Sequence, residues 1–407
     1  MNCRHCATPL QHTFLDLGFA PPSNAYLSRA DLNKPEKYYP LKVKVCTRCW
    51  LVQTEDYAQV DELFSDDYAY FSSTSSGWLS HASHYAKTVI QRFQLGADSQ
   101  VIEIASNDGY LLKNFVAAGI PCIGIEPTAS TAAKAEKLGI PVLREFFGEA
   151  LGKQLTTNHK QADLIAGNNV YAHVPDINDF TYGLKAALKP NGIITLEFPH
   201  LMRLIEHTQF DTVYHEHFSY LSLYTVERIF KAAGLRIWDV EQLSTHGGSL
   251  RIYGCHAEDS RTRTTAVATL LAEEAQRGLK TLATYQNFQA RADKVKDDLL
   301  KFLIDQKSAG NKVVAYGAAA KGNTLLNYAG VKPDLLTFVC DAAHAKQGKY
   351  MPGSHIPILS PDALATSAPD YVVILPWNIA AEVKQANAAL KESGSKFVTA
   401  VPELRIG

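Results

Sequence analysis

Long apolar runs are missing from this sequence. The first residues, Met1 to Cys6, have no apolar core of the kind a signal peptide carries, and the most apolar short stretch, residues 371–377, is far too short to span a bilayer. A surplus of one charge is missing as well, since 40 Lys and Arg stand against 41 Asp and Glu. A nucleic-acid binder would usually carry a basic excess. We therefore expect a cytoplasmic protein with neither a membrane nor nucleic acid among its partners.

Two further signatures are absent. Neither of the two glycine-containing loops that could hold a cofactor reads Gly-x-Gly-x-x-Gly, the fingerprint of dinucleotide enzymes. No short repeat, low-complexity tract or obvious disordered tail is visible. What remains is an ordinary globular composition, 46% hydrophobic and 20% charged over 407 residues, which indicates two or three folded domains.

Four of the seven cysteines form two Cys-x-x-Cys pairs, Cys3 with Cys6 and Cys46 with Cys49. Zinc binds a tetrahedron of soft ligands, and each pair supplies two thiolates. The 39 residues between the pairs can close into a loop because closure entropy rises slowly with loop length. We predict a structural zinc site with no open coordination position. The alternatives are a redox pair or unliganded thiols in a reducing compartment.

Short apolar runs alternate with helical patterns from residue 86 to 260. We expect strands near 99–104, 121–125, 162–167 and 192–198, helices near 110–118 and 183–188, a turn at 189–192 and an edge strand at 250–253. Strands that alternate with helices predict a parallel sheet with helices on both faces.

A second unit of the same kind follows a long helical run at 266–306. Strands are expected at 312–316, 335–340 and 371–375, with a glycine-rich turn and a helix after the first. The predicted fold class is therefore α/β. It comprises a zinc module with an aromatic lid at 1–85, a central Rossmann-like domain at 86–260, and a linker helix with a second Rossmann-like domain at 261–407.

The segment Glu103–Gly109 follows a strand and opens a helix. Small residues in such a turn let the backbone approach a ligand, and the helix N-terminus adds partial positive charge. About twenty residues later Glu126 closes the next strand, where an acid can hold ribose hydroxyls. This spacing is shared by dinucleotide enzymes and by methyltransferases that use S-adenosylmethionine. It predicts a nucleotide-type cofactor site.

An acid–base cluster lies in Val213–Phe218, where Tyr214, His215, Glu216 and His217 are consecutive. Such a cluster offers a base, a partner that tunes it and a hydrogen-bond donor, which are the components of proton abstraction. A carbon next to a ketone is weakly acidic, and histidine has a suitable pKa to deprotonate it. We expect His215 to point away from its neighbours and to be structural.

Two glycine-rich turns lie nearer the C-terminus. Ser244–Arg251 combines backbone donors with a fixed positive charge, and Arg251 could form a bidentate pair with a phosphate. Tyr316–Asn323 opens a helix and carries Lys321, while Asp341 ends the next strand. These features predict a nucleotide-diphosphate site. The alternative is a C-terminal unit that only packs against the central domain.

The order of these motifs along the whole chain resembles one family, the S-adenosylmethionine-dependent sugar 3-C-methyltransferases. The resemblance rests on the four cysteines and on sequence segments at 103–109, 124–127, 168–174, 197–200, 214–218, 246–251 and 316–323. Ala105 is a departure, because glycine would be expected there in the cofactor loop.

The resemblance implies roles for individual residues. It makes His217 the base, assisted by Glu216 and Tyr214, with His173 and Tyr68 lining the site; whether Tyr68 or Tyr70 faces the substrate stays open. The cofactor residues would be Glu103, Ala105, Ser106, Asn107, Gly109, Glu126, Asn168 and Asn169. The substrate residues would be Arg251, Lys321, Asn323 and Asp341.

The favoured function is methyl transfer from S-adenosylmethionine to C-3 of a nucleotide-diphospho-4-keto-6-deoxyhexose, through an enolate formed by a base. One alternative is a nicotinamide-dependent oxidoreductase that acts on a nucleotide sugar. Another is a zinc-stabilised binding protein, against which the polar cluster speaks because four such groups are costly to bury without a task. The sequence leaves open the stereochemistry of the sugar, an amino or hydroxyl group at C-3, the nucleotide base and the oligomeric state.

Overall fold

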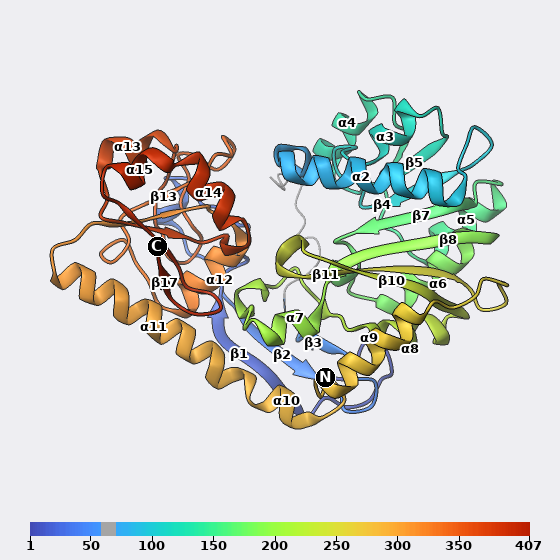
Figure 1. Cartoon of the computed structure of the whole chain (residues 1–407), viewed down its shortest axis with the longest axis horizontal. Coiled ribbons are helices and arrows are strands. Elements are labelled where there is room, and N and C mark those ends of the chain that lie inside the picture. Colours follow the sequence, from blue (N-terminus) through green and yellow to red (C-terminus); the bar gives the residue numbers. More distant parts are fainter. Residues whose placement is uncertain (58–70) are drawn as a thin grey trace.

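The computed structural model describes residues 1–57 and 71–407. Three sheets organise this part of the chain, with strand orders β1-β2-β3-β9, β10-β11-β8-β7-β4-β5-β6 and β14-β13-β12-β15-β16-β17. Figure 1 shows the central sheet at the right and the C-terminal unit at the left, with β1 and α11 running along the bottom between them. The predicted α/β fold class is confirmed.

The central sheet is mixed. Its strands are β4 (Val101–Ile104), β5 (Cys122–Ile125), β6 (Val142–Leu143), β7 (Ala162–Asn168), β8 (Leu188–Pro199), β10 (Leu235–Leu243) and β11 (Ser249–His256). The first five are parallel, whereas β11 is antiparallel to both β8 and β10. The strand expected at the edge at 250–253 is therefore interior, because β10 supplies the edge and pairs along the whole length of β11.

The turn expected at Lys189–Gly192 is also wrong. These residues belong to β8, whose pairing with β7 shifts from Ala162↔Leu188 to Leu164↔Ile193. Four residues of β8 thus stand opposite Asp163 alone. Pro190 and Gly192 have the composition of a turn, and here they lie in an irregularity of the ladder where a side chain at Gly192 would come within 2.6 Å of Leu188 Cδ1.

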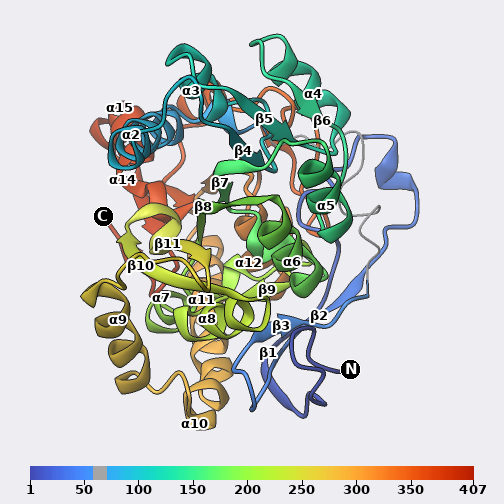
Figure 2. The same ribbon diagram turned by 90° about the vertical axis from the view of Figure 1, so that its right-hand side faces the viewer.

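Helices cover both faces of the central sheet. One face carries α2 (Ser76–Phe93), α3 (Leu112–Ala117) and α4 (Ala129–Glu136), and the other carries α5 (Glu149–Thr157), α6 (Ile177–Ala187) and α8 (Leu223–Ala232). Neighbouring strand residues go to opposite cores, as Leu164 and Ile165 do, which is why the strands are largely apolar. Figure 2 shows α2 and α3 on the side away from α6 and α8.

The N-terminal sheet borrows a strand from the central part of the chain. It consists of β1 (His12–Ala20), β2 (Tyr39–Val45), β3 (Val52–Thr54) and β9 (Ser219–Tyr220), all antiparallel. Because β9 directly follows the acid–base cluster, this pairing anchors the cluster against the N-terminal sheet. Helix α2, by contrast, packs on the central sheet, although part of it falls in the segment expected to form the zinc module.

The helical run expected at 266–306 is three helices, α9 (Thr265–Gln276), α10 (Leu282–Gln286) and α11 (Phe288–Ser308). Gly278 follows the end of the first helix, and its φ of 80° is accessible to glycine at no steric cost. Phe288 at the start of α11 stacks on Phe14 of β1, with 4.6 Å between ring centroids. This contact ties the linker to the N-terminal sheet.

The C-terminal sheet consists of β12 (Val313–Tyr316), β13 (Val339–Cys340), β14 (Ile358–Leu359), β15 (Tyr371–Ile374) and β16 (Lys396–Thr399), all parallel, and the antiparallel β17 (Arg405–Ile406). Helices α12 (Ala320–Tyr328), α13 (Asp362–Ser367), α14 (Ala380–Ala386) and α15 (Ala388–Glu392) flank it. Among residues 1–57 and 71–407, no helix has the length and apolar character needed to cross a membrane.

Candidate active site

A cavity of about 680 Å³ opens where the carboxyl ends of β4, β5 and β7 face the start of α12. The carboxyl edge of a parallel sheet is the usual ligand site of such folds. Its lining includes residues of the expected cofactor loop, of the acid–base cluster and of the C-terminal unit. The structure therefore brings three separate sequence motifs to one cavity.

The cofactor loop is held by Glu126. Its carboxylate accepts hydrogen bonds from the backbone N–H of Asn107 and of Thr128, both at 2.9 Å. Ala105 (φ 57°) and Asn107 (φ 49°) are left-handed, so the methyl of Ala105 adds strain at a position where glycine would be relaxed. A side chain at Gly109 would come within 2.5 Å of Ile140 Cδ1, which explains glycine there.

The expected cofactor residues divide into two groups. Those that line the cavity are Ala105, Asn107, Glu126, Asn168 and Asn169, and those that do not are Glu103, Ser106 and Gly109. Glu103 is fully buried, and burial raises its pKa well above the usual range.

The cavity suits S-adenosylmethionine, whose ribose hydroxyls and ammonium group are hydrogen-bond donors. The Oδ1 atom of Asn168 is buried and accepts no hydrogen bond from a described residue, and Asn168 lines the cavity. A buried acceptor without a donor costs free energy until a ligand supplies one. The residues present therefore fit this cofactor.

The backbone carbonyl of Thr212 fixes the tautomer of His217. The Nδ1–H of His217 donates to this carbonyl at 2.8 Å, so the neutral ring has an unprotonated Nε2. Burial lowers the pKa of His217 well below its usual value, and nearby His173 lowers it further. His217 lines the cavity as a neutral imidazole with a lone pair to accept a proton.

Two neighbours pack on the ring of His217. Ring centroids lie 3.9 Å away for Tyr214 and 4.5 Å away for His173. Burial lowers the pKa of His173 to about 4, opposed by its hydrogen bond to the backbone carbonyl of Glu216. Both neighbours also line the cavity, whereas Tyr68 and Tyr70 lie outside the described residues.

Asn24 was not found from the sequence, yet it binds the carboxylate of Glu216. Its Nδ2 donates to both carboxylate oxygens, at 2.9 and 2.8 Å. Asn24 and Glu216 both line the cavity. His215 faces the other way, with its Nε2 3.3 Å from the carbonyl of Tyr39 on β2. No local pattern could reveal Asn24, because it lies far from Glu216 along the chain.

Of the four expected substrate residues, only Lys321 lines the cavity. Its ammonium group donates to Asn378 Oδ1 at 2.7 Å and lies 4.7 Å from the centroid of Trp377. Burial lowers its pKa, and the charge of Asp211 opposes that effect. Burial in turn raises the pKa of Asp211 to about 6. The charge of the buried Lys321 ammonium group is thus compensated only in part by the carboxylate of Asp211.

The other three expected substrate residues make contacts within the protein. Asn323 donates to the carbonyl of Ser23 at 2.6 Å, and Asp341 lies 3.4 Å from the ammonium group of Lys346. Lys346 itself lines the cavity and was not expected from the sequence.

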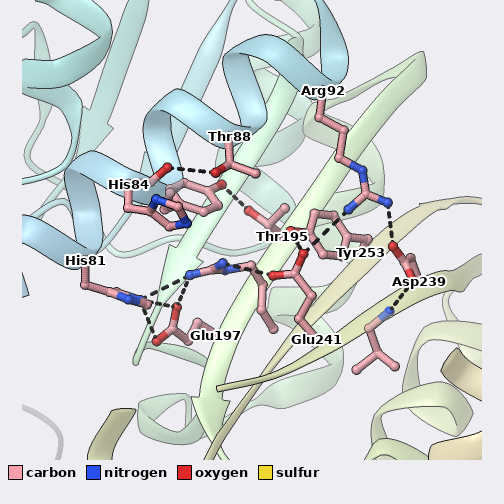
Figure 3. A network of polar contacts seen from close by, with 12 residues as sticks. His81, His84, Thr88, Arg92, Thr195, Glu197, Asp239, Glu241 and Tyr253 are labelled. Atoms are coloured by element: carbon pink, nitrogen blue, oxygen red, sulfur yellow. Dashed lines mark hydrogen bonds and ion pairs between the residues drawn. The ribbon is translucent and has the colours of Figure 1, made fainter. Parts of the chain in front are cut away.

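Arg251 holds two strands and a helix together. Its guanidinium lies 2.6 Å from Glu197 and 3.2 Å from Glu241, over the ring of Tyr85 on α2. Figure 3 shows this network, in which His81 also reaches Glu197. Burial raises the pKa of Glu197, but the contacts with His81 and Arg251 hold this pKa below its usual value. Two carboxylates thus share the charge of Arg251, and its assignment to a substrate phosphate stays a prediction that this placement does not support.

The four cysteines of the two pairs converge. All four Sγ atoms lie within 4.8 Å of one another, with 3.5 Å between Cys3 and Cys49 and between Cys6 and Cys46. Sulfur atoms in a tetrahedron with Zn–S bonds of about 2.3 Å are about 3.8 Å apart. The donor set fits zinc, and four thiolates leave no position for a substrate.

Comparison with known proteins gives three family models along the chain. They describe a zinc binding domain at residues 3–64, a methyltransferase domain at 78–240 and a C-methyltransferase C-terminal domain at 244–402. C-methyltransferase NovU from Streptomyces niveus is 34% identical over 405 residues, which cover 100% of this chain and 96% of that protein.

Two solved structures show weaker likeness. The PH0226 protein from Pyrococcus horikoshii OT3 is 13% identical, with a TM-score of 0.39 over 49% of this chain and 99% of that one. Magnesium protoporphyrin IX methyltransferase from Synechocystis PCC 6803 with bound SAH is also 13% identical, with a TM-score of 0.36 over 44% of this chain and 84% of that one.

The domain model matches a methyltransferase, and the central fold agrees with it, since Glu126 directly follows β5. Together they define a methyltransferase that uses S-adenosylmethionine. The four-cysteine site is a zinc site of the matching N-terminal domain. The chain belongs to the C-methyltransferase family, with the match to NovU running over its whole length. The alternatives of a nicotinamide oxidoreductase and of a binding protein without catalysis are therefore wrong.

Proposed function

We propose that the chain transfers the methyl group to C-3 of a nucleotide-diphosphate-linked 4-keto-6-deoxyhexose. One observation carries the proposal: a neutral histidine with a fixed tautomer, His217, lines the same cavity as the cofactor loop and Lys321. A ketone with an acidic neighbouring carbon needs a base of this kind, and a diphosphate needs a cation.

His217 is the proposed base. Its Nε2 takes the proton from the carbon beside the ketone, and the electron pair of that C–H bond becomes the π bond of the enolate. The carbonyl of Thr212 stays hydrogen-bonded to Nδ1 and holds the ring in place while it is positively charged. Glu216, held by Asn24, and Tyr214 assist from the same segment. When bound, S-adenosylmethionine supplies an electrophilic methyl group to the carbon that has lost its proton.

The cofactor would be held by residues at the strand ends. We assign the ribose to Glu126 and the ammonium group to Asn168, because one is a carboxylate at the end of β5 and the other is a buried acceptor that lacks a donor. The backbone amides of the loop Ala105–Asn107 complete this half of the cavity.

The nucleotide diphosphate is assigned to the C-terminal unit. Lys321 lies in the first turn of α12, where the helix N-terminus favours an anion. Lys346 lines the same part of the cavity and adds a second cation. This half of the proposal does not depend on Arg251.

The test is to incubate the protein with methyl-labelled S-adenosylmethionine and a panel of nucleotide-linked 4-keto sugars, and to locate the label by NMR. We expect label on C-3, and label on C-5 would contradict the proposed position. The same sugars reduced to the 4-hydroxyl are matched controls that should receive no label. Label on oxygen or nitrogen, or equal labelling of the reduced sugars, would overturn the proposal.

A further inference from the structure

A short turn between β10 and β11 places an additional histidine, His246, in the cavity. The turn η5 (Thr245–Gly247) holds His246 at φ 54° and ψ 22°, a left-handed conformation that residues with side chains rarely adopt. Two glycines follow with φ of 87° and 118°. A side chain on Gly247 would come within 2.4 Å of Trp377, so the turn fits tightly against the C-terminal unit.

The partner of His246 is a second left-handed residue. Asn169 follows β7 with φ 53°, and its Nδ2 lies 3.0 Å from Nε2 of His246. An amide nitrogen can only donate, so Nε2 of His246 accepts and the neutral ring carries its proton on Nδ1. Left-handed residues with bulky side chains concentrate at functional sites, where the surrounding structure holds them in place. Here left-handed His246 contacts left-handed Asn169 in one cavity.

The remaining ring nitrogen of His246 is available to a ligand. Its Nδ1 makes no hydrogen bond to a described residue and is not among the buried side-chain atoms that lack a partner, so this atom is accessible. Burial and the charge of Lys321 lower the pKa of His246 to about 4, against the opposing charge of Glu197, so the ring is neutral near pH 7. A neutral N–H donor can stabilise an oxyanion without protonating it.

The other cavity histidines have different tasks. His217 uses its N–H on the carbonyl of Thr212, and His173 contacts the backbone carbonyl of Glu216. Among the histidines of the cavity lining, His246 is therefore the one whose N–H faces no protein acceptor in the described part of the chain.

We infer that Nδ1–H of His246 donates a hydrogen bond to the ketone oxygen of the substrate and to the enolate oxygen formed from it. The inference rests on the proposed function, since it needs a ketone. The proton leaves carbon for Nε2 of His217, the negative charge moves to oxygen, and His246 keeps its own proton throughout. One histidine is then the base, and another is the oxyanion donor, on different segments of the cavity lining.

The first test does not need the reaction. Histidine-selective ¹⁵N NMR of the wild type, with His246 assigned by loss of its signals in His246→Asn, should show protonated Nδ1 and unprotonated Nε2 at pH 7. In Asn169→Asp the new carboxylate should draw a proton to Nε2 and convert the ring to imidazolium. A wild-type ring protonated on Nε2, or on both nitrogens, at pH 7 would overturn the inference.

The second test measures turnover. Asparagine tolerates the left-handed conformation, so His246→Asn should fold with an unchanged melting temperature while its shorter side chain fails to reach the oxygen. We expect kcat to fall about 10²–10³-fold, as for loss of one oxyanion donor, with KM for both substrates changed less than about 3-fold. Exchange of the substrate's carbon-bound hydrogen with deuterated water should slow in parallel. Ser244→Ala, an exposed change in the same connection, is the control and should keep full activity.

The two proposals fail in different ways. A wild type that methylates nucleotide 4-keto sugars together with a fully active His246→Asn variant would overturn the role of His246 alone. A wild type that methylates no ketone would overturn the proposed function, and the role of His246 on a ketone would fall with it.

Discussion

The carbonyl of Thr212 decides which nitrogen of His217 can accept a proton, and a substitution can exploit this. In His217→Asn the side-chain amide can still donate to Thr212, but an amide takes no proton at neutral pH. We expect the rate to fall about 10²–10⁴-fold, the usual contribution of a positioned base. Calorimetry should show unchanged binding of S-adenosylmethionine.

The control is the adjacent histidine. His215 points to the carbonyl of Tyr39 and away from the cavity, so His215→Asn should lower the rate by less than about 10-fold. Equal loss in both variants would mean that the whole segment had moved. An active His217→Asn variant would transfer the role of base to another residue.

The pH dependence follows from the same residue. His217 acts as a base only when neutral, and its pKa is lowered well below 6.5 by burial and by neighbouring His173. The fraction of neutral His217 therefore stays near one as the pH falls from 8 to 6.5, and it declines only at lower pH. We expect the acid limb of kcat/KM to lie below pH 6.5. An acid limb centred above pH 7 in the wild type would contradict this assignment.

At the scale of elements, the zinc loops support the helix and turn next to the active site. The carbonyl of Cys49 accepts a hydrogen bond from Thr225 on α8, and Arg4 donates to the carbonyl of Pro175, two residues after His173. Metal binding is part of folding in such sites. Loss of zinc should therefore disturb the central domain as well as the N-terminal sheet.

We expect Cys49→Ser to bind less than one zinc per chain and to melt at a lower temperature than the wild type. Elemental analysis and thermal unfolding measure these two effects. His12→Ala is the matched control, because histidine is the common alternative ligand and His12 lies outside the four-sulfur cluster. A Cys49→Ser variant with full zinc and an unchanged melting temperature would remove Cys49 from the metal site.

The parallel strands of the central sheet could be predicted, and the antiparallel ones less so. Strand β4 is a short, fully buried run, apolar except for Glu103, before a glycine-containing turn, a pattern with few other interpretations. Strand β1 gave no such signal, because register shifts after Thr13 and after Asp16 break its alternation of apolar and polar residues. Strand β9 has only two residues, too few for any periodicity.

The candidate site, like the fold, could be predicted only in part. Tyr214, Glu216 and His217 are adjacent in sequence, so their chemistry was visible as one cluster. Asn24 is 192 residues from Glu216, and His246 is 77 residues from Asn169. Such pairs are created by the packing of separate elements, and no local pattern of residues encodes them.

At the scale of the whole molecule, the three parts of the chain share one hydrophobic core. Phe14 of the N-terminal sheet, Val213 of the acid–base segment and Leu325 of α12 belong to the same buried cluster. Thr324 of α12 also donates to the carbonyl of Val213. The C-terminal unit therefore packs directly against the acid–base segment.

A chain that ends at Ser308 should accordingly lose more than the proposed nucleotide site. It would expose the apolar residues of β1 and α11 that now pack against β12 and α12. Exposed patches of this size favour aggregation. We expect sedimentation to show oligomers and circular dichroism to show a lower melting temperature than the full chain. A monomeric truncated chain with the full chain's melting temperature would show that the units fold independently.

The pairing of β3 with β9 has a consequence for synthesis on the ribosome. Strand β3 is made early, but its partner emerges only after the whole run from β4 to β8 has been translated. At about 5–20 residues per second, the nascent chain carries an open strand edge for many seconds, and such edges recruit other chains. The edge closes when Ser219 and Tyr220 are synthesised, directly after the acid–base cluster. Completion of the N-terminal sheet and synthesis of His217, the proposed base, thus fall within a few residues of each other.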